Sequence, residues 1–220
     1  MNQQIPINSY DTNINKQIPN YHQFHHETLR LLNAYGQPVN KWLDTGCGTG
    51  NIVFFAKEYF KDTQFYFADP DEEMLVQVQN KISDTNAVIF PPCSTDKINT
   101  DVTFDVITAI ICHHYMDIQA KKLALEKCYS MLNKGGIYIT FEHILSDTST
   151  GFDIALKMME DFHQTNGVSE TERRKFADRI HKVLLIITVN DYMRILKEAG
   201  FSVVELFFRS HMQAGFYAIK

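Results

Sequence analysis

Hydrophobic and polar positions follow two different periods through residues 21–143. Short apolar runs bounded by Gly, Pro, Asn or Asp indicate buried strands, whereas longer stretches with apolar residues three or four positions apart indicate amphipathic helices. The expected strands are 41–45, 64–68, 87–90, 104–111 and 137–141. The helices expected between and before them are 21–35, 51–60, 71–82 and 118–132. Strands that alternate with helices in this way predict a parallel, doubly wound α/β sheet.

The pattern changes on both sides of this region. Residues 1–20 are polar and rich in Asn and Gln, and we expect a loop that buries little apolar surface. After residue 148 the sequence predicts two helices, 152–163 and 169–181. Residues 183–189 are apolar, and their period does not distinguish a strand from part of a buried helix.

The C-terminal residues predict a helix and then a hairpin. Asn190 is expected to cap a helix that stops at Gly200, and 201–208 and 213–219 favour two antiparallel strands. The fold predicted for the whole chain is α/β: a Rossmann-like, doubly wound, seven-stranded sheet with an antiparallel C-terminal hairpin and a helical cap. We expect one domain over 1–220, in which 1–36 forms an N-terminal lid and helix and 148–185 a helical cap insertion.

Composition narrows the class of protein. The net charge of −5 disfavours a stand-alone nucleic-acid binder, which usually has a basic excess. The four cysteines form no CxxC pair, which disfavours a zinc ribbon or a disulfide scaffold. The N-terminal residues resemble no secretory signal, and the longest apolar run is far shorter than the roughly 20 residues of a membrane span. These features predict a cytoplasmic protein.

A glycine cluster lies where the first strand gives way to the second helix. Gly46, Gly48 and Gly50 follow Asp44, in a place where the chain must turn tightly and a ligand can approach the backbone. The GxGxxG pattern of dinucleotide sites fails because Asn51 stands where it requires glycine. Asp44 could accept a hydrogen bond from an ammonium group. The alternative is a glycine turn without a ligand.

A second acid lies at the end of the next strand. Asp69 is close to the spacing of about 20 residues at which an acid binds ribose hydroxyls. A carboxylate can accept from two hydroxyls at once. The alternative is that Asp69 caps the helix that begins near Asp71. With the glycine cluster, Asp69 favours an adenosine-type ligand at the carboxyl end of the sheet.

These motifs resemble those of the class I S-adenosylmethionine-dependent methyltransferases. The run from Asp44 to Gly50 is similar to the first motif of that family, and Asp69 to its ribose-binding acid. Residues 104–107 resemble the fourth-strand motif. Residues 132–136 resemble Leu-x-Pro-Gly-Gly, with lysine in place of proline. The resemblance covers most of residues 40–143.

The resemblance implies S-adenosylmethionine as cofactor, with S-adenosylhomocysteine as product. It places Gly46 and Gly48 against the methionine moiety, Asp69 at the ribose, and Cys93 and Ser94 beside the adenine, where many members have an aspartate. The cofactor-binding residues implied in this way are Tyr21, Asp44, Gly46, Cys47, Gly48, Asp69, Pro70, Cys93, Ser94 and Ile110. No metal site is implied.

The flanking segments resemble a narrower group, the carboxy-S-adenosylmethionine synthases of tRNA wobble-uridine modification. Residues 17–21 and the segment from 161 to the C-terminus are similar to that group, and Tyr21 matches a tyrosine that closes over the ligand. In that group an arginine pairs with the extra carboxylate of the ligand, whereas Ala177 stands at the matching position here. The difference favours ordinary methyl transfer from S-adenosylmethionine, because a carboxylate needs a fixed donor.

The function expected is therefore methyl transfer to a small or medium acceptor. Two alternatives stay open: a carboxy-S-adenosylmethionine synthase-like enzyme, and a non-catalytic S-adenosylmethionine-binding module. The expected partner is a small molecule. Transfer RNA is disfavoured by the net charge, a membrane is not expected, and a homodimer is only what the narrower resemblance suggests.

Histidines supply the candidate catalytic groups. His113 and His114 follow the fourth strand and His143 the fifth, where an imidazole could deprotonate a nucleophile near neutral pH. The alternative is that they are polar residues packed at strand ends. His22, His25 and His26 have the spacing of a metal-binding pair on a helix, but no third ligand is evident.

Overall fold

The computed structural model describes residues 13–82 and 87–220. Its centre is a single sheet with the strand order β3-β2-β1-β4-β5-β8-β7, and the short β6 pairs with β5 off this path. The strands are β1 Lys41–Thr45, β2 Gln64–Ala68, β3 Ala87–Ile89, β4 Phe104–Ile110, β5 Leu132–Leu145, β6 Ile187–Thr188, β7 Val203–Ser210 and β8 Gln213–Ile219. Strands β1 to β5 are mutually parallel, whereas β8 runs antiparallel to both β5 and β7. The predicted α/β class, doubly wound sheet and C-terminal hairpin are confirmed.

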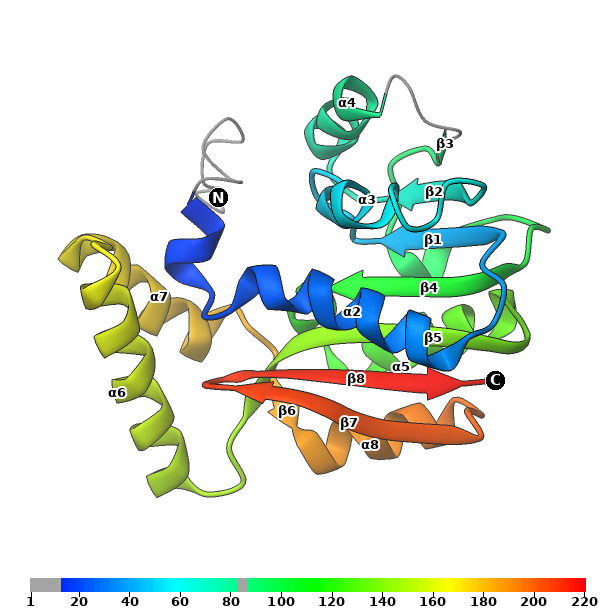
Figure 1. Cartoon of the computed structure of the whole chain (residues 1–220). Helices are drawn as coiled ribbons and strands as arrows, with labels where there is room; N and C mark the ends of the chain where they lie inside the picture. The colour runs from blue at the N-terminus through cyan, green and yellow to red at the C-terminus, as the bar shows by residue number, and fades with distance from the viewer. Residues whose placement is uncertain (1–12, 83–86) are drawn as a thin grey trace.

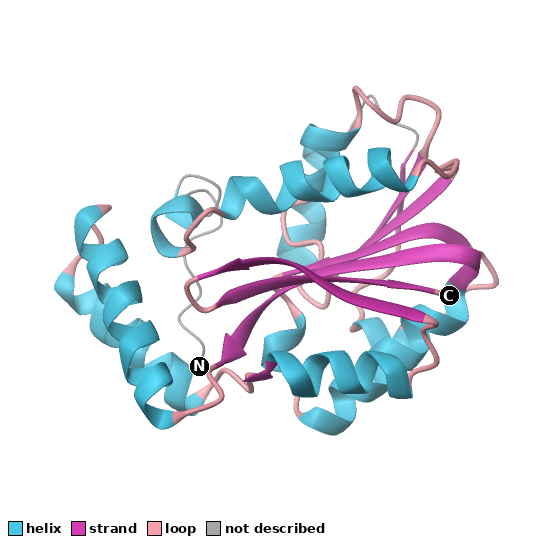
Figure 2. Cartoon of the chain, turned by 60° about the horizontal axis from the view of Figure 1, so that its bottom comes forward, coloured by secondary structure: helices cyan, strands magenta, loops and turns pink. Residues whose placement is uncertain are grey.

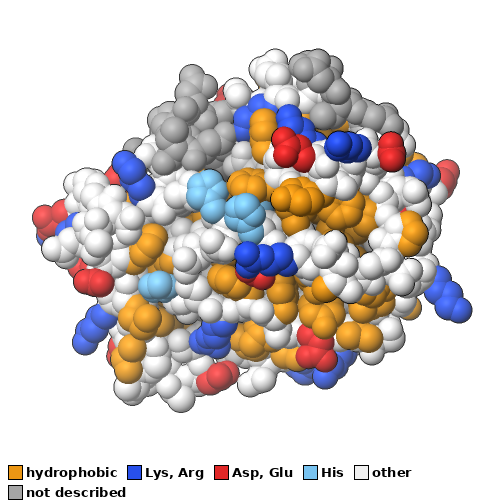
Figure 3. Space-filling model, in the orientation of Figure 1, with side chains coloured by type: hydrophobic (Ala, Val, Ile, Leu, Met, Phe, Trp, Pro, Cys, Tyr) orange, Lys and Arg blue, Asp and Glu red, His pale blue; other side chains and the backbone are white. Residues whose placement is uncertain are grey.

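Helices cover both faces of the sheet, as Figures 1 and 2 show. The helices are α2 Tyr21–Tyr35, α3 Asn51–Ala56, α4 Glu72–Lys81, α5 Ile118–Met131, α6 Ser149–Thr165, α7 Glu170–Lys182 and α8 Val189–Glu198, with 3-10 turns η1 Thr95–Lys97 and η2 His113–Tyr115. None of the described helices is long and apolar enough to cross a membrane. On the face drawn in Figure 3, basic and acidic side chains are interspersed.

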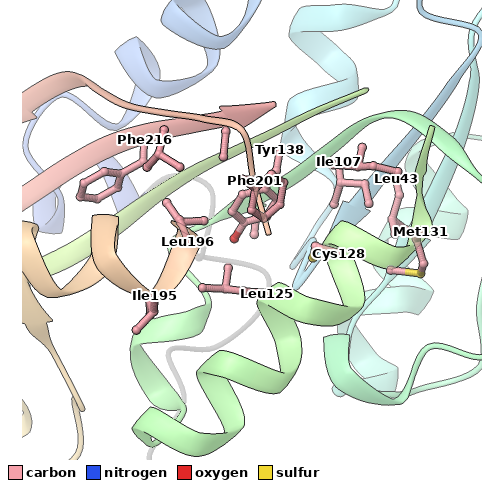
Figure 4. Close-up of a cluster of buried hydrophobic side chains, with 14 of the residues drawn as sticks. Leu43, Ile107, Leu125, Cys128, Met131, Tyr138, Ile195, Leu196, Phe201 and Phe216 are labelled. Atoms are coloured by element: carbon pink, nitrogen blue, oxygen red, sulfur yellow. The ribbon is translucent and has the colours of Figure 1, made fainter. Parts of the chain in front are cut away.

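Two apolar clusters, one on each face of the sheet, hold the layers together. On one face, side chains of β1, β4 and β5 pack against α5 and α8, with Leu43, Ile107, Leu125 and Leu196 fully buried (Figure 4). On the other face, α2, α3 and α4 cover the same strands through a cluster that includes Phe24. Burial of this area drives the two-sided arrangement.

Helices α6 and α7 pack together beyond the carboxyl ends of β1 and β4, where Figure 1 shows them in yellow. They share a small apolar cluster with Met212, in which Met159 and Ile180 are buried. The pair falls within the predicted cap at 148–185. That it covers a ligand stays a prediction.

Two sequence expectations about single segments are wrong. Residues 13–17 are helical rather than a loop, and Ile14 and Ile18 are buried in the cluster that contains Phe24. Helix α8 is capped by Thr188, whose side chain accepts from the Asp191 amide at 3.1 Å, and not by Asn190. Residues 1–12 of the predicted lid lie outside the described residues. The ambiguous segment 183–189 contains the loop after α7, the two-residue strand β6 and the first residue of α8. Strand β6 is an eighth strand beyond the seven expected.

Candidate active site

The glycine turn links β1 to α3 with a left-handed backbone at each glycine. The φ angles are +59° at Gly46, +53° at Gly48 and +73° at Gly50. A Cβ on Gly46 would lie 2.5 Å from Cys112 Cβ, so close packing against the end of β4 excludes any side chain there. A Cβ on Gly48 would meet nothing within 4 Å. Gly48 therefore faces open space, as a backbone that supports a ligand must.

Asp69 connects the glycine turn to the end of β2. Its carboxylate accepts from the Gly48 amide at 2.8 Å and from the Asp71 amide at 2.9 Å. Burial raises its pKa, and the two backbone hydrogen bonds oppose that shift. Asp71 caps α4 by accepting from the Glu73 amide at 2.9 Å, so Asp69 is not the helix cap. Each Asp69 oxygen has a second lone pair, which leaves acceptors for hydroxyl groups.

Asp44 is buried at the carboxyl end of β1 and ends a chain of hydrogen bonds. The Trp42 indole donates to Thr108 Oγ1 at 2.9 Å, and the Thr108 hydroxyl donates to Asp44 Oδ1 at 2.7 Å. Burial raises the pKa of Asp44 to about 7, against the effect of the Thr108 hydrogen bond. A cation beside this carboxyl would ionise it.

The segment after β3 packs beside Asp69. The Cys93 amide donates to the Asp69 carbonyl at 3.1 Å, and Thr95 and Thr45 hydroxyls lie 2.7 Å apart. The Ser94 hydroxyl donates to Asp96 Oδ1 at 2.6 Å. The sequence analysis did not name Asp96 as a candidate site residue, although this acid stands only three positions after Cys93.

The other residues implied by the resemblance surround the same edge of the sheet. Tyr21 is buried in the cluster of α2 and α3, and Cys47 and Ile110 pack against that cluster. Pro70 is exposed between Asp69 and the cap of α4. Burial raises the pKa of the Cys47 thiol well above its ordinary value, so it stays protonated at neutral pH. The structure thus brings the implied residues to one edge of the sheet, and their contacts with a ligand stay predictions.

The three candidate histidines lie together but have different environments. His113 is fully buried, with Nε2 3.0 Å from Thr95 Oγ1 and Nδ1 3.1 Å from Tyr138 Oη, and burial lowers its pKa to about 4. His143 Nδ1 accepts from the Gln213 amide at 3.1 Å, and burial lowers its pKa to about 3. His114 and His143 have ring centroids 4.8 Å apart.

Glu142 holds the histidine turn in place. It is buried on the part of β5 that extends past the end of β4, and it accepts from the His113 amide at 3.0 Å and from His114 Nδ1 at 3.1 Å. Hydrogen bonding and charge from His114 outweigh the cost of burial and lower the pKa of Glu142 to about 2. The buried Lys121 Nζ donates to the His113 carbonyl at 2.6 Å. The sequence analysis predicted neither the role of Glu142 nor that of Lys121. A glutamate in an otherwise apolar strand was the feature that could have indicated the role of Glu142.

Two clusters within residues 13–82 and 87–220 have metal-ligating residue types. Ligand atoms of Cys112, His113 and Glu142 lie within 4.8 Å of one another, but each already has a hydrogen-bonding partner, and Lys121 adds a positive charge nearby. This cluster is therefore a polar network of the protein itself. The histidines of α2 instead surround the Phe55 ring, on which His25 stacks at 4.7 Å.

Comparison with known proteins points to one group. Residues 43–138 match a family described as a methyltransferase domain. The chain is 24% identical to the carboxy-S-adenosyl-L-methionine synthase of Staphylococcus epidermidis, over 97% of this chain and 93% of that one.

Solved structures share the fold. An S-adenosylmethionine-dependent methyltransferase from Clostridium acetobutylicum aligns with a TM-score of 0.68 at 12% identity, covering 96% of each chain. The plantazolicin methyltransferase BpumL, solved with a triazolic desmethylPZN analog and SAH, aligns with a TM-score of 0.72 at 12% identity, over 97% of this chain and 90% of that one. Residues 43–138 thus match a methyltransferase domain, and the sheet order and the glycine turn agree with the fold of S-adenosylmethionine-dependent methyltransferases.

Proposed function

We propose that this enzyme transfers the methyl group of S-adenosylmethionine to a small or medium acceptor. The observation that carries the proposal is the open space at Gly48, beside a carboxylate that is held by two backbone amides. In the proposal Gly46 and Gly48 support the methionine part, Asp44 pairs with its ammonium group, and Asp69 accepts from the ribose hydroxyls. These roles use donors and acceptors already oriented by hydrogen bonds, which reduces the entropy lost on binding.

The chemistry that bound S-adenosylmethionine supplies is a methyl group already activated by a sulfonium. The chain therefore has to align the acceptor and exclude water. Helices α6 and α7 and the segment 13–20 are the elements proposed to do so. The His163 side chain lies 2.8 Å from the Gln17 carbonyl and ties the segment to α6.

The direct test is calorimetry with S-adenosylmethionine and S-adenosylhomocysteine, followed by transfer of labelled methyl groups into a metabolite extract. Binding of both compounds and appearance of a labelled acceptor would support the proposal. Binding without a labelled acceptor would favour a non-catalytic binding module, and the absence of binding would refute both.

A second candidate is a carboxy-S-adenosylmethionine synthase-like activity, because the similarity to those proteins extends over nearly the whole chain. Ala177 on α7 argues against it, since no positive charge stands at that position. The nearby Arg179 guanidinium instead donates to the Tyr115 hydroxyl at 2.6 Å. Mass spectrometry of the ligand bound after incubation with extract would separate the two activities.

A further inference from the structure

The hydrogen bonds of the three histidines determine which of them has a ring nitrogen with a free lone pair. A neutral imidazole carries its proton on one nitrogen and accepts with the other. In His113 both nitrogens contact other side chains of the protein. In His143 the Gln213 amide donates to Nδ1, so the proton of the neutral ring is on Nε2. Neither ring offers a lone pair to a bound acceptor.

His114 differs because its partner is a carboxylate. Glu142 accepts from the His113 amide and faces His114 Nδ1 at 3.1 Å, so in the neutral imidazole Nδ1 carries the proton and Nε2 has the free lone pair. The His114 side chain is 2% exposed, and its Nε2 makes no hydrogen bond with the described residues. Its lone pair is therefore unused within the described part of the chain, at the carboxyl edge of the sheet.

The place of His114 in the fold fits a reacting group. It follows Cys112, whose side chain packs on Gly46 of the turn proposed to hold the donor. Its own carbonyl accepts from the Leu185 amide at 2.7 Å, at the end of the cap segment. The turn thus lies between the proposed donor site and the cap. The titratable or charged groups around it are Glu142 and His143 on β5, His113 and Tyr115 on η2, Lys121 on α5 and Arg179 on α7.

We propose that His114 Nε2 is the general base of the methyl transfer and that Glu142 is the residue that positions it. This inference rests on the proposed function and names its acceptor class: a nucleophile that carries a proton, such as a hydroxyl, rather than a tertiary amine. His114 removes the acceptor proton as the acceptor lone pair bonds to the methyl carbon and the carbon–sulfur pair stays on sulfur. The imidazolium is stabilised by Glu142 and later releases the proton to water.

The contacts of Glu142 make one substitution especially informative. Glu142 Oε1 accepts from the His113 amide at 3.0 Å, while Oε2 faces His114. In Glu142→Gln the carbonyl oxygen is held by the His113 amide, which can only donate, so the amide nitrogen takes the place of Oε2. It then donates to Nδ1 and moves the His114 proton to Nε2. The shape is kept, but the base has the wrong tautomer.

The experiment compares the wild type with Glu142→Gln and His114→Gln, and uses Glu198→Gln on the exposed surface of α8 as the matched control. Nitrogen-15 NMR of the histidine rings, with S-adenosylhomocysteine present, reports the tautomer without any acceptor. We expect the proton on Nδ1 in the wild type and the control, and on Nε2 in Glu142→Gln. Loss of the signal in His114→Gln assigns it.

Transfer of labelled methyl into extract should fall by about 100-fold or more in Glu142→Gln and His114→Gln, with an unchanged KM for the donor. Normal donor binding with the wild-type proton on Nε2, or full transfer by His114→Gln, would overturn the inference alone. Failure of the wild type to bind the donor would overturn the proposed function, and the inference with it. If Glu142→Gln does not fold, the tautomer measured in the wild type and the methyl-transfer rate of His114→Gln still test the inference.

Discussion

Gly46 and Gly48 share a left-handed backbone for different reasons. The sequence showed three glycines at alternate positions, which predicted a tight turn. It could not show that the Cys112 side chain leaves no room for a Cβ at position 46, because that contact depends on how β4 lies beside β1. The histidines are a similar case. Their position at the sheet edge was predictable, but their hydrogen bonds depend on Glu142, which β5 carries past the end of β4.

Gly48→Ala should abolish donor binding while the protein still folds. The new methyl group would occupy the open space proposed to hold the methionine part, and a left-handed alanine costs about 1–2 kcal/mol of stability. Gly135→Ala is the matched control, because Gly135 also has a positive φ, +76°, and a Cβ there would meet nothing within 4 Å. Gly135 lies near the N-terminal end of β5, away from the proposed donor site. Calorimetry should show loss of binding only in Gly48→Ala. Normal donor binding by Gly48→Ala would show that the glycine turn connects β1 to α3 without binding the donor.

Asp69→Ala should weaken donor binding by about 1.5–3 kcal/mol, the scale of hydrogen bonds to a charged group. Asp71→Ala removes the cap of α4 instead and should cost about 1 kcal/mol of folding stability without a change in donor affinity. Calorimetry and chemical denaturation measure the two effects. Unchanged affinity in folded Asp69→Ala would remove this residue from the ribose site.

Donor affinity should rise between about pH 6 and about pH 7.5, because Asp44 has a pKa of about 7 and must ionise to pair with an ammonium group. Binding then releases a proton, which calorimetry in buffers of different ionisation enthalpy detects. Asp44→Asn keeps an acceptor for the Thr108 hydroxyl and should bind weakly with no such pH dependence. A flat profile in the wild type would contradict the proposed ion pair.

At the scale of elements, strong periodicity gave correct boundaries. Helix α2 and strands β1 and β2 have the predicted ends, because their apolar faces are regular and Gly36 stops α2. The cap of α8 was predicted wrongly because Asn190 and Thr188 are both good caps, and the pairing of Thr188 with Leu145 decides between them. The helix at 13–17 was missed, although Ile14 and Ile18 have helical spacing.

The N-terminal lid and helix predicted over 1–36 include the segment 13–20, which the structure describes. Asn20 donates to the Ser210 hydroxyl at 2.8 Å, and the Gln17 carbonyl contacts His163, so the segment bridges the terminal hairpin and α6. S-Adenosylhomocysteine should slow hydrogen exchange there, and Tyr21→Ala should reduce the protection. The lid hypothesis is wrong if the ligand does not change hydrogen exchange in this segment and Tyr21→Ala lowers the folding stability equally with and without ligand. Tyr21 would then only anchor the N-terminal segment.

At the scale of the whole molecule, buried histidines make the fold sensitive to acid. Burial lowers the pKa of His25 and His143 to about 3 and that of His113 to about 4. The unfolded chain takes up these protons near pH 6.5, so stability falls as the pH drops from about 6.5 to about 4. Asp44 opposes the trend, because it is already protonated in the fold below about pH 7. Three groups against one give a slope of roughly 3 kcal/mol per pH unit near pH 5.

Denaturant titrations at several pH values measure this slope. His25→Phe should reduce it by one proton and raise stability, because both ring nitrogens of His25 are buried without a partner. The same substitution at the exposed His22 is the control. A slope that His25→Phe leaves unchanged would show that His25 does not stay neutral in the fold.

In the proposed function, the chain moves a methyl group from S-adenosylmethionine to an acceptor. The most direct measurement incubates the purified enzyme with methyl-carbon-13 S-adenosylmethionine and a metabolite extract, and follows the label by mass spectrometry. We expect a labelled acceptor and an equal amount of S-adenosylhomocysteine, both lost in Gly48→Ala. A donor that gains a carboxyl group, with no labelled acceptor, would contradict methyl transfer.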